Sequence, residues 1–290
     1  MLTTIVETEE LAARLRSASW RVVDCRFDLK NTAAGERAYA DRHVPGAVYA
    51  HLDGDLSGEK TGSNGRHPLP DPQAFAQTLG RLGIGPSTQV IAYDQDSGMY
   101  ASRLWWMLRW LGHDAVAVLN GGFAKWLAEG RATSPGVETA IPQSFAARPR
   151  QGMVATSVDV ALRARQREWR LLDARAPERF RGEQETVDRI AGHIPGARNH
   201  FFQTNLTDRG VLRSPVDLKT RFGQVLGDTS PTHAICYCGS GVTACQNLLA
   251  LEHAGLPGAQ LYVGSWSEWS ADPSRPVAKG REEPGSAVSE

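Results

Sequence analysis

The chain carries the same four short motifs twice, in the same order along its 290 residues. Each second copy follows the first by 143 to 150 residues. The pairs are RVVDCRF (21–27) with RLLDARA (170–176), RHVPGAVYAHL (42–52) with GHIPGARNHFF (192–202), IAYDQDSG (91–98) with ICYCGSGV (235–242), and VLNGGFAKW (118–126) with YVGSWSEW (262–269). Four ordered matches at nearly one spacing indicate a duplicated domain.

Short apolar runs alternate with helical patterns inside each copy. RVVD, QVIAYD and AVAVLN have the length and β-branched content of strands. SRLWWMLRWLG (102–112) repeats its apolar residues at helical spacing and ends at a glycine. This alternation predicts an α/β fold: two tandem domains, each a mostly parallel sheet with helices on both faces.

A stretch rich in Pro, Gly, Ser and Thr separates the two copies and reads as an interdomain linker. We therefore expect an N-terminal domain over residues 1–130, a linker over 131–155, and a C-terminal domain over 156–278. The remaining residues, 279–290, are expected to form an irregular tail.

Composition excludes several classes of protein. Lys+Arg and Asp+Glu both number 32, so net charge gives no argument for binding nucleic acid or a membrane surface. No apolar run approaches the ~20 residues of a membrane-spanning helix. The 4 cysteines are a poor disulfide framework for so long a chain, which favours a reducing cytoplasm. No metal site is expected, because no second Cys or His pair follows at zinc-finger spacing.

The loop after the strand-like run AICY is the strongest chemical signal. It begins at Cys238 and leads into a helical pattern that stops at Gly255. In open α/β sheets, ligands bind at the carboxyl ends of parallel strands, which is where Cys238 is expected. The loop continues with Gly239, Ser240, Gly241, Val242 and Thr243.

Two glycines in this loop let the backbone curl, so that successive N–H groups point at one centre. The following helix adds its positive N-terminal end. Both effects favour an anion at the Cys238 sulfur and make it a nucleophile, and the Ser240 and Thr243 hydroxyls can donate to the same charge. A merely buried cysteine needs no such loop; that interpretation suits Cys236 and Cys245 better.

These motifs resemble the tandem-domain rhodanese superfamily. The resemblance rests on CGSGVTAC, the paired H[VI]PGA motifs, DAR…RFRG and GSWSEW, and it spans nearly the whole chain. It implies that Cys238 takes a sulfane sulfur from a donor as a persulfide and passes it to an acceptor. It also implies that the N-terminal domain is a non-catalytic copy, because Asp94 stands where the cysteine would be and cannot carry a persulfide.

The resemblance extends to the choice of donor. Thiosulfate-preferring members resemble Cys-Arg-Lys-Gly-Val-Thr, with cationic side chains for a dianionic donor, whereas Gly239 and Ser240 are neutral. The loop is therefore more similar to the 3-mercaptopyruvate branch, whose donor is a monoanion. Phosphatases that share the fold need a longer loop closed by an arginine; Ala244 stands near that place.

Within that branch a histidine, an aspartate and the loop serine assist the cysteine. The resemblance assigns these roles to His67 in GRHPLP, Asp53 in HLDGD, and Ser240. Histidine suits proton transfer near neutral pH. The residues alone leave His67 open between this role and a solvated loop histidine, and Asp55 lies two residues from Asp53.

Two arginines bind the donor's carboxylate and ketone in the family. Arg179 in RFRG matches the first, since a planar guanidinium suits bidentate carboxylate binding. Arg181, two residues later, could take this role instead, and Arg179 could also be an ordinary surface arginine. Arg189 in VDRIAGHIPG is the candidate for the second arginine. His43 and His193 recur in both copies, so we expect each to brace a turn.

We therefore expect a cytoplasmic sulfurtransferase that needs no metal or organic cofactor. Its sulfur acceptor would be a small thiol, a reduced thioredoxin or cyanide. An internal duplication often does the work of a dimer, so a monomer is expected. The alternatives are a thiosulfate:cyanide sulfurtransferase with the same nucleophile, and a non-catalytic protein that binds or senses sulfur species.

Overall fold

Two five-stranded sheets of identical topology form the framework of the computed structural model, which describes residues 1–281. Every strand pair is parallel in both sheets. The first sheet has the order β1-β5-β4-β2-β3 and the second β6-β10-β9-β7-β8. The strands are β1 (Ile5–Val6), β2 (Trp20–Asp24), β3 (Val48–Tyr49), β4 (Gln89–Tyr93), β5 (Val116–Leu119), β6 (Val154–Ala155), β7 (Arg170–Asp173), β8 (Ala197–Asn199), β9 (Ala234–Tyr237) and β10 (Gln260–Tyr262).

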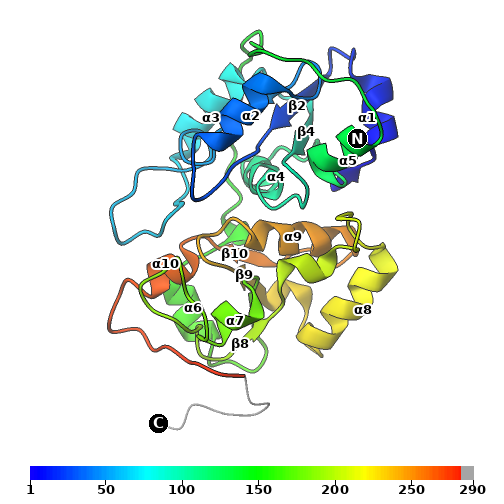
Figure 1. The fold of residues 1–290 in the computed structure, drawn as a ribbon. Coiled ribbons are helices and arrows are strands. Elements are labelled where there is room, and N and C mark those ends of the chain that lie inside the picture. The colour runs from blue at the N-terminus through cyan, green and yellow to red at the C-terminus, as the bar shows by residue number, and fades with distance from the viewer. Residues whose placement is uncertain (282–290) are drawn as a thin grey trace. The chain divides into compact units, whose positions relative to one another are not determined.

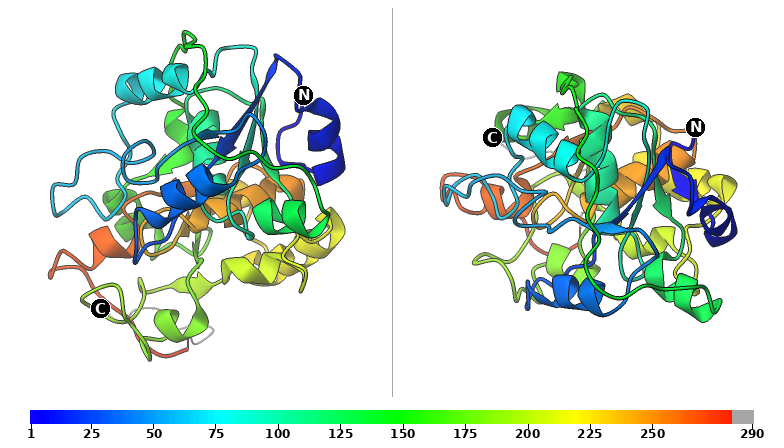
Figure 2. Two further views of the ribbon diagram at one scale, coloured as in Figure 1. Left: turned by 45° about the horizontal axis from the view of Figure 1, so that its top comes forward. Right: turned by 90° about the horizontal axis from the view of Figure 1, so that it is seen from above.

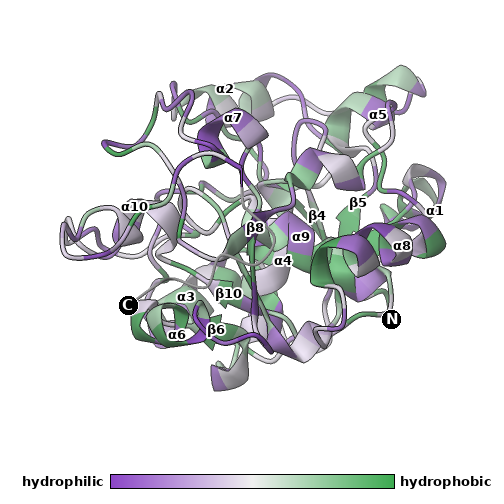
Figure 3. Ribbon diagram, turned by 90° about the horizontal axis from the view of Figure 1, so that it is seen from below, coloured by the Kyte–Doolittle hydropathy of each residue, from purple (hydrophilic) through white to green (hydrophobic). Residues whose placement is uncertain are grey.

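Helices pack around each sheet (Figures 1 and 2). The central strands β4 and β9 are buried at every residue, which requires cover on both faces. In Figure 3, β4 and β5 are coloured as apolar, whereas the short helix α7 is largely hydrophilic. The helices are α1 (Thr8–Arg14), α2 (Ala34–Asp41), α3 (Pro72–Arg81), α4 (Ala101–Trp110), α5 (Gly122–Ala128), α6 (Ser157–Arg163), α7 (Pro177–Phe180), α8 (Pro215–Leu226), α9 (Ala244–His253) and α10 (Ser265–Trp269). The predicted fold class is confirmed.

Local sequence signals explain where several helices begin. The Asp71 side chain accepts hydrogen bonds from the N–H groups of Gln73 and Ala74, and proline follows at the first helical position of α3. Ser214 caps α8 in the same way, again with proline next. Three short 3₁₀ turns complete the structure, η1 (Gln151–Met153), η2 (Phe202–Asn205) and η3 (Pro231–His233).

The chain divides into two compact units, each of which is made of several separate segments of the sequence. The first unit holds residues 1–58, 69–150 and 206–212, and the second holds 59–68, 151–205 and 213 onward. Residues 131–150, within the predicted linker, lie with the first unit, where the Gln143 N–H donates to the Gly80 carbonyl at 2.9 Å. Of the predicted tail, residues 282–290 lie outside the described part of the chain.

A buried aspartate–arginine pair recurs at the same place in both units. Arg26 pairs with Asp24 at 2.7 Å in the first unit, and Arg175 pairs with Asp173 at 2.6 Å in the second. Each arginine also donates to a main-chain carbonyl before the H[VI]PGA motif, that of Arg42 or Gly192. The paired motifs DCR and DAR are therefore structural.

The motif histidines also hold the fold in both units. Nδ1 of His43 bonds the Tyr39 carbonyl at 2.9 Å, and Nδ1 of His193 bonds the Phe180 carbonyl at 2.8 Å. Both side chains are buried. The prediction that these histidines brace turns is confirmed. None of the helices in residues 1–281 has both the length and the apolar composition needed to cross a membrane.

Candidate active site

Cys238 is the first residue after β9 and opens the loop to α9. It is 1% exposed. Gly241 has a φ of +73°, and a Cβ built there would stand 2.4 Å from the Val263 carbonyl oxygen, so the turn admits only glycine. The tight curl that the glycines predicted is therefore present. N–H groups of Gly239, Ser240 and Val242 make no hydrogen bond with any residue in 1–281.

The segment between β10 and α10 holds the peptide groups of Cys238 on both sides. The Ser265 hydroxyl accepts from the Cys238 N–H at 3.1 Å and donates to the Tyr262 carbonyl at 2.9 Å. The N–H groups of Trp266 and Ser267 donate to the carbonyls of Cys238 and Gly239, both at 2.9 Å. Ser265 does this from a φ of 53°, and it is the one non-glycine residue with positive φ in residues 1–281. Such strain is typical of functional sites.

His67 lies against the loop serine. Its Nδ1 and the Ser240 hydroxyl are 2.8 Å apart, and the two side chains belong to residues that are 3% and 7% exposed. The contact forms within the second unit, because residues 59–68 belong to it. The alternative of a solvated loop histidine is therefore wrong.

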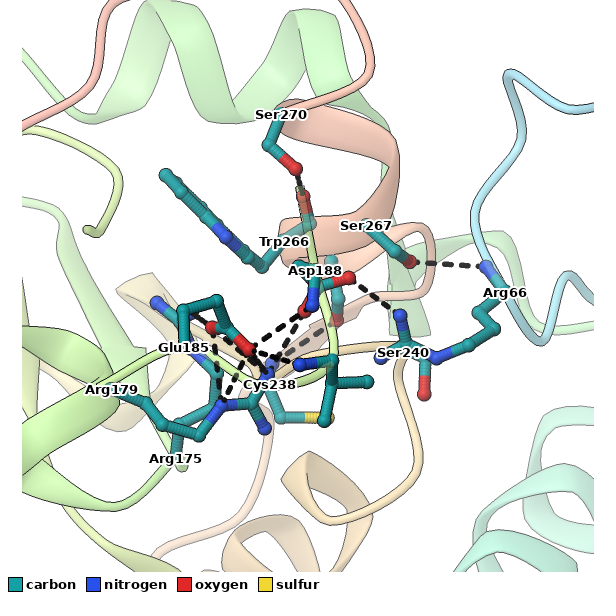
Figure 4. Close-up of polar contacts among 12 residues, drawn as sticks. Arg66, Arg175, Arg179, Glu185, Asp188, Cys238, Ser240, Trp266, Ser267 and Ser270 are labelled. Carbon is teal, nitrogen blue, oxygen red and sulfur yellow. Dashed lines mark hydrogen bonds and ion pairs between the residues drawn. The ribbon is translucent and has the colours of Figure 1, made fainter. Parts of the chain in front are cut away.

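Two guanidinium groups face the residue next to the cysteine. A Cβ built on Gly239 would lie 3.0 Å from Nη2 of Arg66 and 3.7 Å from Nη2 of Arg179. Asp188 bridges the two arginines: one carboxylate oxygen pairs with Arg66 at 2.5 Å and the other with Arg179 at 2.9 Å. Figure 4 shows Arg179, Glu185 and Asp188 beside Cys238, with Arg66 reaching the same aspartate.

Glu185 is the second carboxylate of this cluster. Both of its oxygens accept from Arg179, at 2.9 to 3.2 Å. Burial acts to raise the pKa of Glu185, but hydrogen bonds from Arg179 and from the N–H groups of Asp188 and Val187 bring it below its usual value. Glu185 therefore stays ionised, and two carboxylates balance the two guanidinium charges near Cys238.

The remaining predicted residues are placed differently. Arg189 is exposed, whereas the side chain of its neighbour Asp188 is 4% exposed. Asp53 belongs to the first unit, where its N–H donates to His51 at 3.1 Å, so its role stays a prediction. Sequence reasoning missed Arg66 and Ser265. In the repeats Ser265 aligns with Gly122, whose φ is +57°, and that substitution could have marked the position.

The corresponding loop of the first unit holds an aspartate. The Asp94 carboxylate accepts hydrogen bonds from the N–H groups of Asp96, Gly98, Tyr100 and Ala101 at 2.7 to 3.2 Å. Burial raises the pKa of Asp94 to about 6, and these hydrogen bonds lower it only in part. Among the described residues, no group of three or more His, Cys, Asp or Glu could hold a metal ion.

Comparisons with known proteins bear on the whole chain. A family model described as "Rhodanese-like domain" matches residues 7–129 and again 157–272. The chain is 44% identical to a probable 3-mercaptopyruvate sulfurtransferase of Pseudomonas aeruginosa, over 95% of this chain and 98% of the relative. It is 35% identical to the thiosulfate sulfurtransferase of Cricetulus griseus, over 96% of each chain.

A solved structure agrees with these relatives. The 3-mercaptopyruvate sulfurtransferase from Leishmania major is 33% identical with a TM-score of 0.82, covering 92% of this chain and 74% of that one. The relatives and this structure are enzymes, so the alternative of a non-catalytic sulfur-binding protein is set aside. The chain belongs to the rhodanese family and is a sulfurtransferase with two rhodanese-like domains in tandem.

Proposed function

We propose that this sulfurtransferase takes its sulfur from 3-mercaptopyruvate and carries it as a persulfide on Cys238. The observation that carries the proposal is the second unit's loop, where Ser240, two residues after Cys238, bonds His67, and two charge-balanced arginines face Gly239, the residue directly after Cys238. The Pseudomonas aeruginosa relative, at 44% identity, supports the same donor. The C-terminal domain, residues 156–278 together with the His67 segment, would then do the chemistry.

The first half-reaction is nucleophilic displacement at sulfur. The Cys238 thiolate attacks the donor's sulfur and forms an S–S bond. The donor's C–S bond breaks, and its electron pair stays on carbon as the enolate of pyruvate, which takes up a proton. The attacking sulfur is negative before the displacement and loses that charge in the new bond, and the terminal sulfur of the persulfide is negative once its proton has been removed.

The loop's N–H groups fit this change of charge. Those of Gly239, Ser240 and Val242 are without acceptors among residues 1–281, so they are free to donate to the thiolate and to the persulfide. Donors held in place before the reaction stabilise developing charge without reorganisation. Gly241 and Thr243 complete the loop, and Thr243 is the N-cap of α9, whose positive N-terminal end directly follows the loop.

Ser240 and His67 would move the protons. At 2.8 Å the serine hydroxyl and the imidazole form one hydrogen-bonded pair, and both are buried. We propose that the pair takes the thiol proton of the incoming donor and returns a proton to the enolate. Asp53 remains a proposed third member.

The charge balance supports a monoanionic donor. Arg66 and Arg179 carry two positive charges, and Glu185 and Asp188 carry two negative ones. A dianion such as thiosulfate would bring a second uncompensated charge into a site that is already neutral. A monoanionic carboxylate would bring only one charge, and Arg179 could meet it with Nη1, because its Nε and Nη2 already donate to Glu185 and Asp188.

In the second half-reaction an acceptor nucleophile attacks the terminal sulfur and Cys238 leaves as thiolate. A small thiol, reduced thioredoxin or cyanide would each serve as acceptor. The four cysteines are all free. That state suits the reducing cytoplasm in which we place the protein.

Steady-state kinetics on the two donors tests the proposal. We expect kcat/KM for 3-mercaptopyruvate to exceed that for thiosulfate by at least about tenfold, with cyanide or dithiothreitol as acceptor. Mass spectrometry after donor exposure should show the gain of one sulfur atom in the wild type and none in Cys238→Ser. A preference for thiosulfate, as the name of the Cricetulus griseus relative suggests for that protein, would overturn the choice of donor.

A further inference from the structure

We propose that Ser267 and Gly65 are positioning residues, which seat residues 59–68 on α10 and so hold His67 against Ser240. We call residues 59–68 the His67 loop. The inference rests on the proposed function, in which the Ser240–His67 pair moves protons. Both positioning residues act through His67 rather than on the sulfur donor.

The His67 loop leaves and returns at nearly one point. Gly58 and Leu69 stand on either side of it, and a Cβ built on Gly58 would lie 2.5 Å from the Leu69 carbonyl oxygen. Inside the loop, the Asn64 side chain accepts from the Thr61 N–H at 2.9 Å. The loop is therefore closed at its base and braced inside, so its place in the second unit depends on the surface on which it rests.

Gly65 makes the closest approach to that surface. Its φ is +85°, and a Cβ built there would lie 2.8 Å from the Gly264 carbonyl oxygen and 3.2 Å from Oγ of Ser267. A side chain at this position would push the loop away. Gly62, in the same loop, has a φ of +86°, but apart from its chain neighbours no residue in 1–281 lies within 4 Å of its Cβ position. Position 65 therefore requires glycine for the contact as well as for the backbone.

Ser267 supplies a hydrogen bond at the same place. Its hydroxyl donates to the Gly264 carbonyl at 3.1 Å and accepts from the Arg66 N–H at 3.0 Å (Figure 4). The next residue of the loop is His67, whose Nδ1 lies 2.8 Å from the Ser240 hydroxyl. The bond to Ser267 therefore fixes the main chain directly before the histidine.

The first unit lacks this hydroxyl at the matching position. In the repeats Ser267 aligns with Ala124. The N–H of Ala124 donates to the Gln95 carbonyl, as the N–H of Ser267 donates to the Gly239 carbonyl. The main-chain bond is thus common to both copies, whereas the hydroxyl belongs only to the copy with the cysteine. This difference favours a role of the hydroxyl in the chemistry over a role in the fold.

A double-mutant cycle asks whether Ser267 acts through His67. We expect Ser267→Ala to lower kcat/KM for 3-mercaptopyruvate about fivefold, the usual worth of one neutral hydrogen bond. The Arg66–Asp188 ion pair should keep the loop attached in this variant, so the protein should stay folded. In a His67→Gln background the same substitution should have no further effect, because the group that it positions is already lost. Independent effects that multiply in the double variant would overturn the inference.

Two further substitutions on α10 complete the cycle. Ser267→Thr keeps a hydroxyl at this position and should stay within about twofold of wild-type kcat/KM. Ser270→Ala is the matched control, because the Ser270 hydroxyl donates to the Trp266 carbonyl at 2.7 Å. It should also stay within about twofold. A loss in Ser270→Ala as large as that in Ser267→Ala would mean that α10 as a whole, and not the seat, had been disturbed.

The two glycines of the loop give an independent comparison, which decides the matter if Ser267→Ala does not fold. Gly65→Ala and Gly62→Ala introduce the same backbone strain, so both should lower the thermal midpoint. Only Gly65→Ala also presses on Gly264, and it should lower kcat/KM about tenfold or more, against less than about twofold for Gly62→Ala. Equal losses in the two variants would contradict a seat at Gly65.

Hydrogen exchange tests the seat without any sulfur donor. Mass spectrometry of peptides covering residues 59–68 should show faster exchange in Ser267→Ala than in the wild type or Ser270→Ala, because the Arg66 N–H has lost its acceptor. Unchanged exchange would overturn the seat, and faster exchange with wild-type kcat/KM would overturn the positioning role. If the wild type prefers thiosulfate, the proposed donor fails, and exchange together with the cycle measured on thiosulfate still decides the role of Ser267.

Discussion

The strand-to-helix loops after β4 and β9 are each held by the same two main-chain hydrogen bonds, an arrangement that we call the frame. The two loops differ in the side chain that the frame encloses. In the first unit, the N–H groups of Phe123 and Ala124 donate to the carbonyls of Asp94 and Gln95 at 2.9 and 2.8 Å. In the second unit, Trp266 and Ser267 make the same two bonds to the Cys238 loop, both at 2.9 Å. Each loop follows a central strand that is buried throughout.

The side chain enclosed by each loop indicates what kind of group the frame stabilises. In the first unit four N–H groups converge on the Asp94 carboxylate, so the chain supplies its own anion. In the second unit a sulfur stands at the same place and loop N–H groups have no acceptor among residues 1–281. We infer that one frame stabilises an anion in both copies, and that the side chain at this place decides whether the anion can carry sulfur.

Exchanging the side chain gives the largest expected effect. Cys238→Asp should fold, because the first unit already holds an aspartate in such a loop. It should lose sulfur transfer by at least about 10³-fold, since a carboxylate cannot form a persulfide and removal of a nucleophile has costs of this order or larger. Persulfide formation by mass spectrometry and kcat measure the loss.

Cys25→Ala is the matched control, because Cys25 is a buried cysteine of the first unit that the mechanism does not use. It should keep the wild-type kcat. Residual transfer in Cys238→Asp near the wild-type rate would mean that another cysteine carries the sulfur, and the comparison of the two loops would lose its chemical meaning.

Removing the Asp94 carboxylate from the first unit's loop should destabilise the protein without changing sulfur transfer at Cys238. Asp94→Ala leaves four N–H groups in a buried loop without their acceptor, which we expect to lower the free energy of unfolding by about 4 kcal/mol. The urea-induced unfolding transition of the first unit measures this change in free energy. Asp96→Ala removes an exposed carboxylate two residues away and should change the free energy by less than about 0.5 kcal/mol. Equal effects in both variants would contradict the anion-holding role of the frame.

The protonation of Asp94 predicts that the stability of the protein depends on pH. Its pKa is raised to about 6 in the folded protein by burial, against about 4 in the unfolded chain. The folded state therefore binds this proton more tightly. The contribution of Asp94 to stability is full below about pH 4, is lost as the pH rises to about 6, and is constant above.

Asp94→Asn isolates this contribution because asparagine does not titrate. The difference in unfolding free energy between wild type and variant should fall by about 3 kcal/mol between pH 4 and pH 7. A flat difference over that range would show that the N–H groups, rather than burial, dominate the ionisation of Asp94. Asp96→Asn provides the baseline, since that carboxylate is exposed.

Local patterns in the sequence were sufficient to predict the strand and helix around the cysteine loop. They were insufficient to predict which distant side chains contact that loop. The strand before Cys238 and the helix after it could be predicted, since apolar periodicity and glycines are read within a few residues. The Ser240–His67 contact joins residues 173 apart, and the Arg66–Asp188 pair joins residues 122 apart. Nothing local indicates that residues 59–68 join the second unit, so the histidine could be proposed only by resemblance.

The exposure of Arg189 could not be predicted for a different reason. In VDRI, an acid and a base are adjacent, and the charge pattern does not say which of the two faces inward. The structure turns Asp188 inward and leaves Arg189 in solvent, and the inward aspartate then recruits a guanidinium from another segment. Only long-range packing decides such a register.

Ser265 is the remaining difference between the two frames, and the smallest expected effect concerns it. The first unit has Gly122 at this place, with φ of +57° against 53° for Ser265. Ser265→Gly would relieve backbone strain of about 1 kcal/mol but would remove the hydroxyl that accepts the Cys238 N–H. We therefore expect stability within about 1 kcal/mol of wild type, together with a severalfold lower kcat because the Cys238 main chain is less firmly held.

Ser265→Ala keeps the strain and loses the same hydrogen bond, so it should be the less stable of the two, with a similar loss of kcat. Thermal unfolding measures the effect on stability, and single-turnover persulfide formation measures the effect on the chemical step. If Ser265→Gly gained stability at full kcat, the strained serine would serve neither the fold nor the nucleophile, and the two frames would be interchangeable at this position.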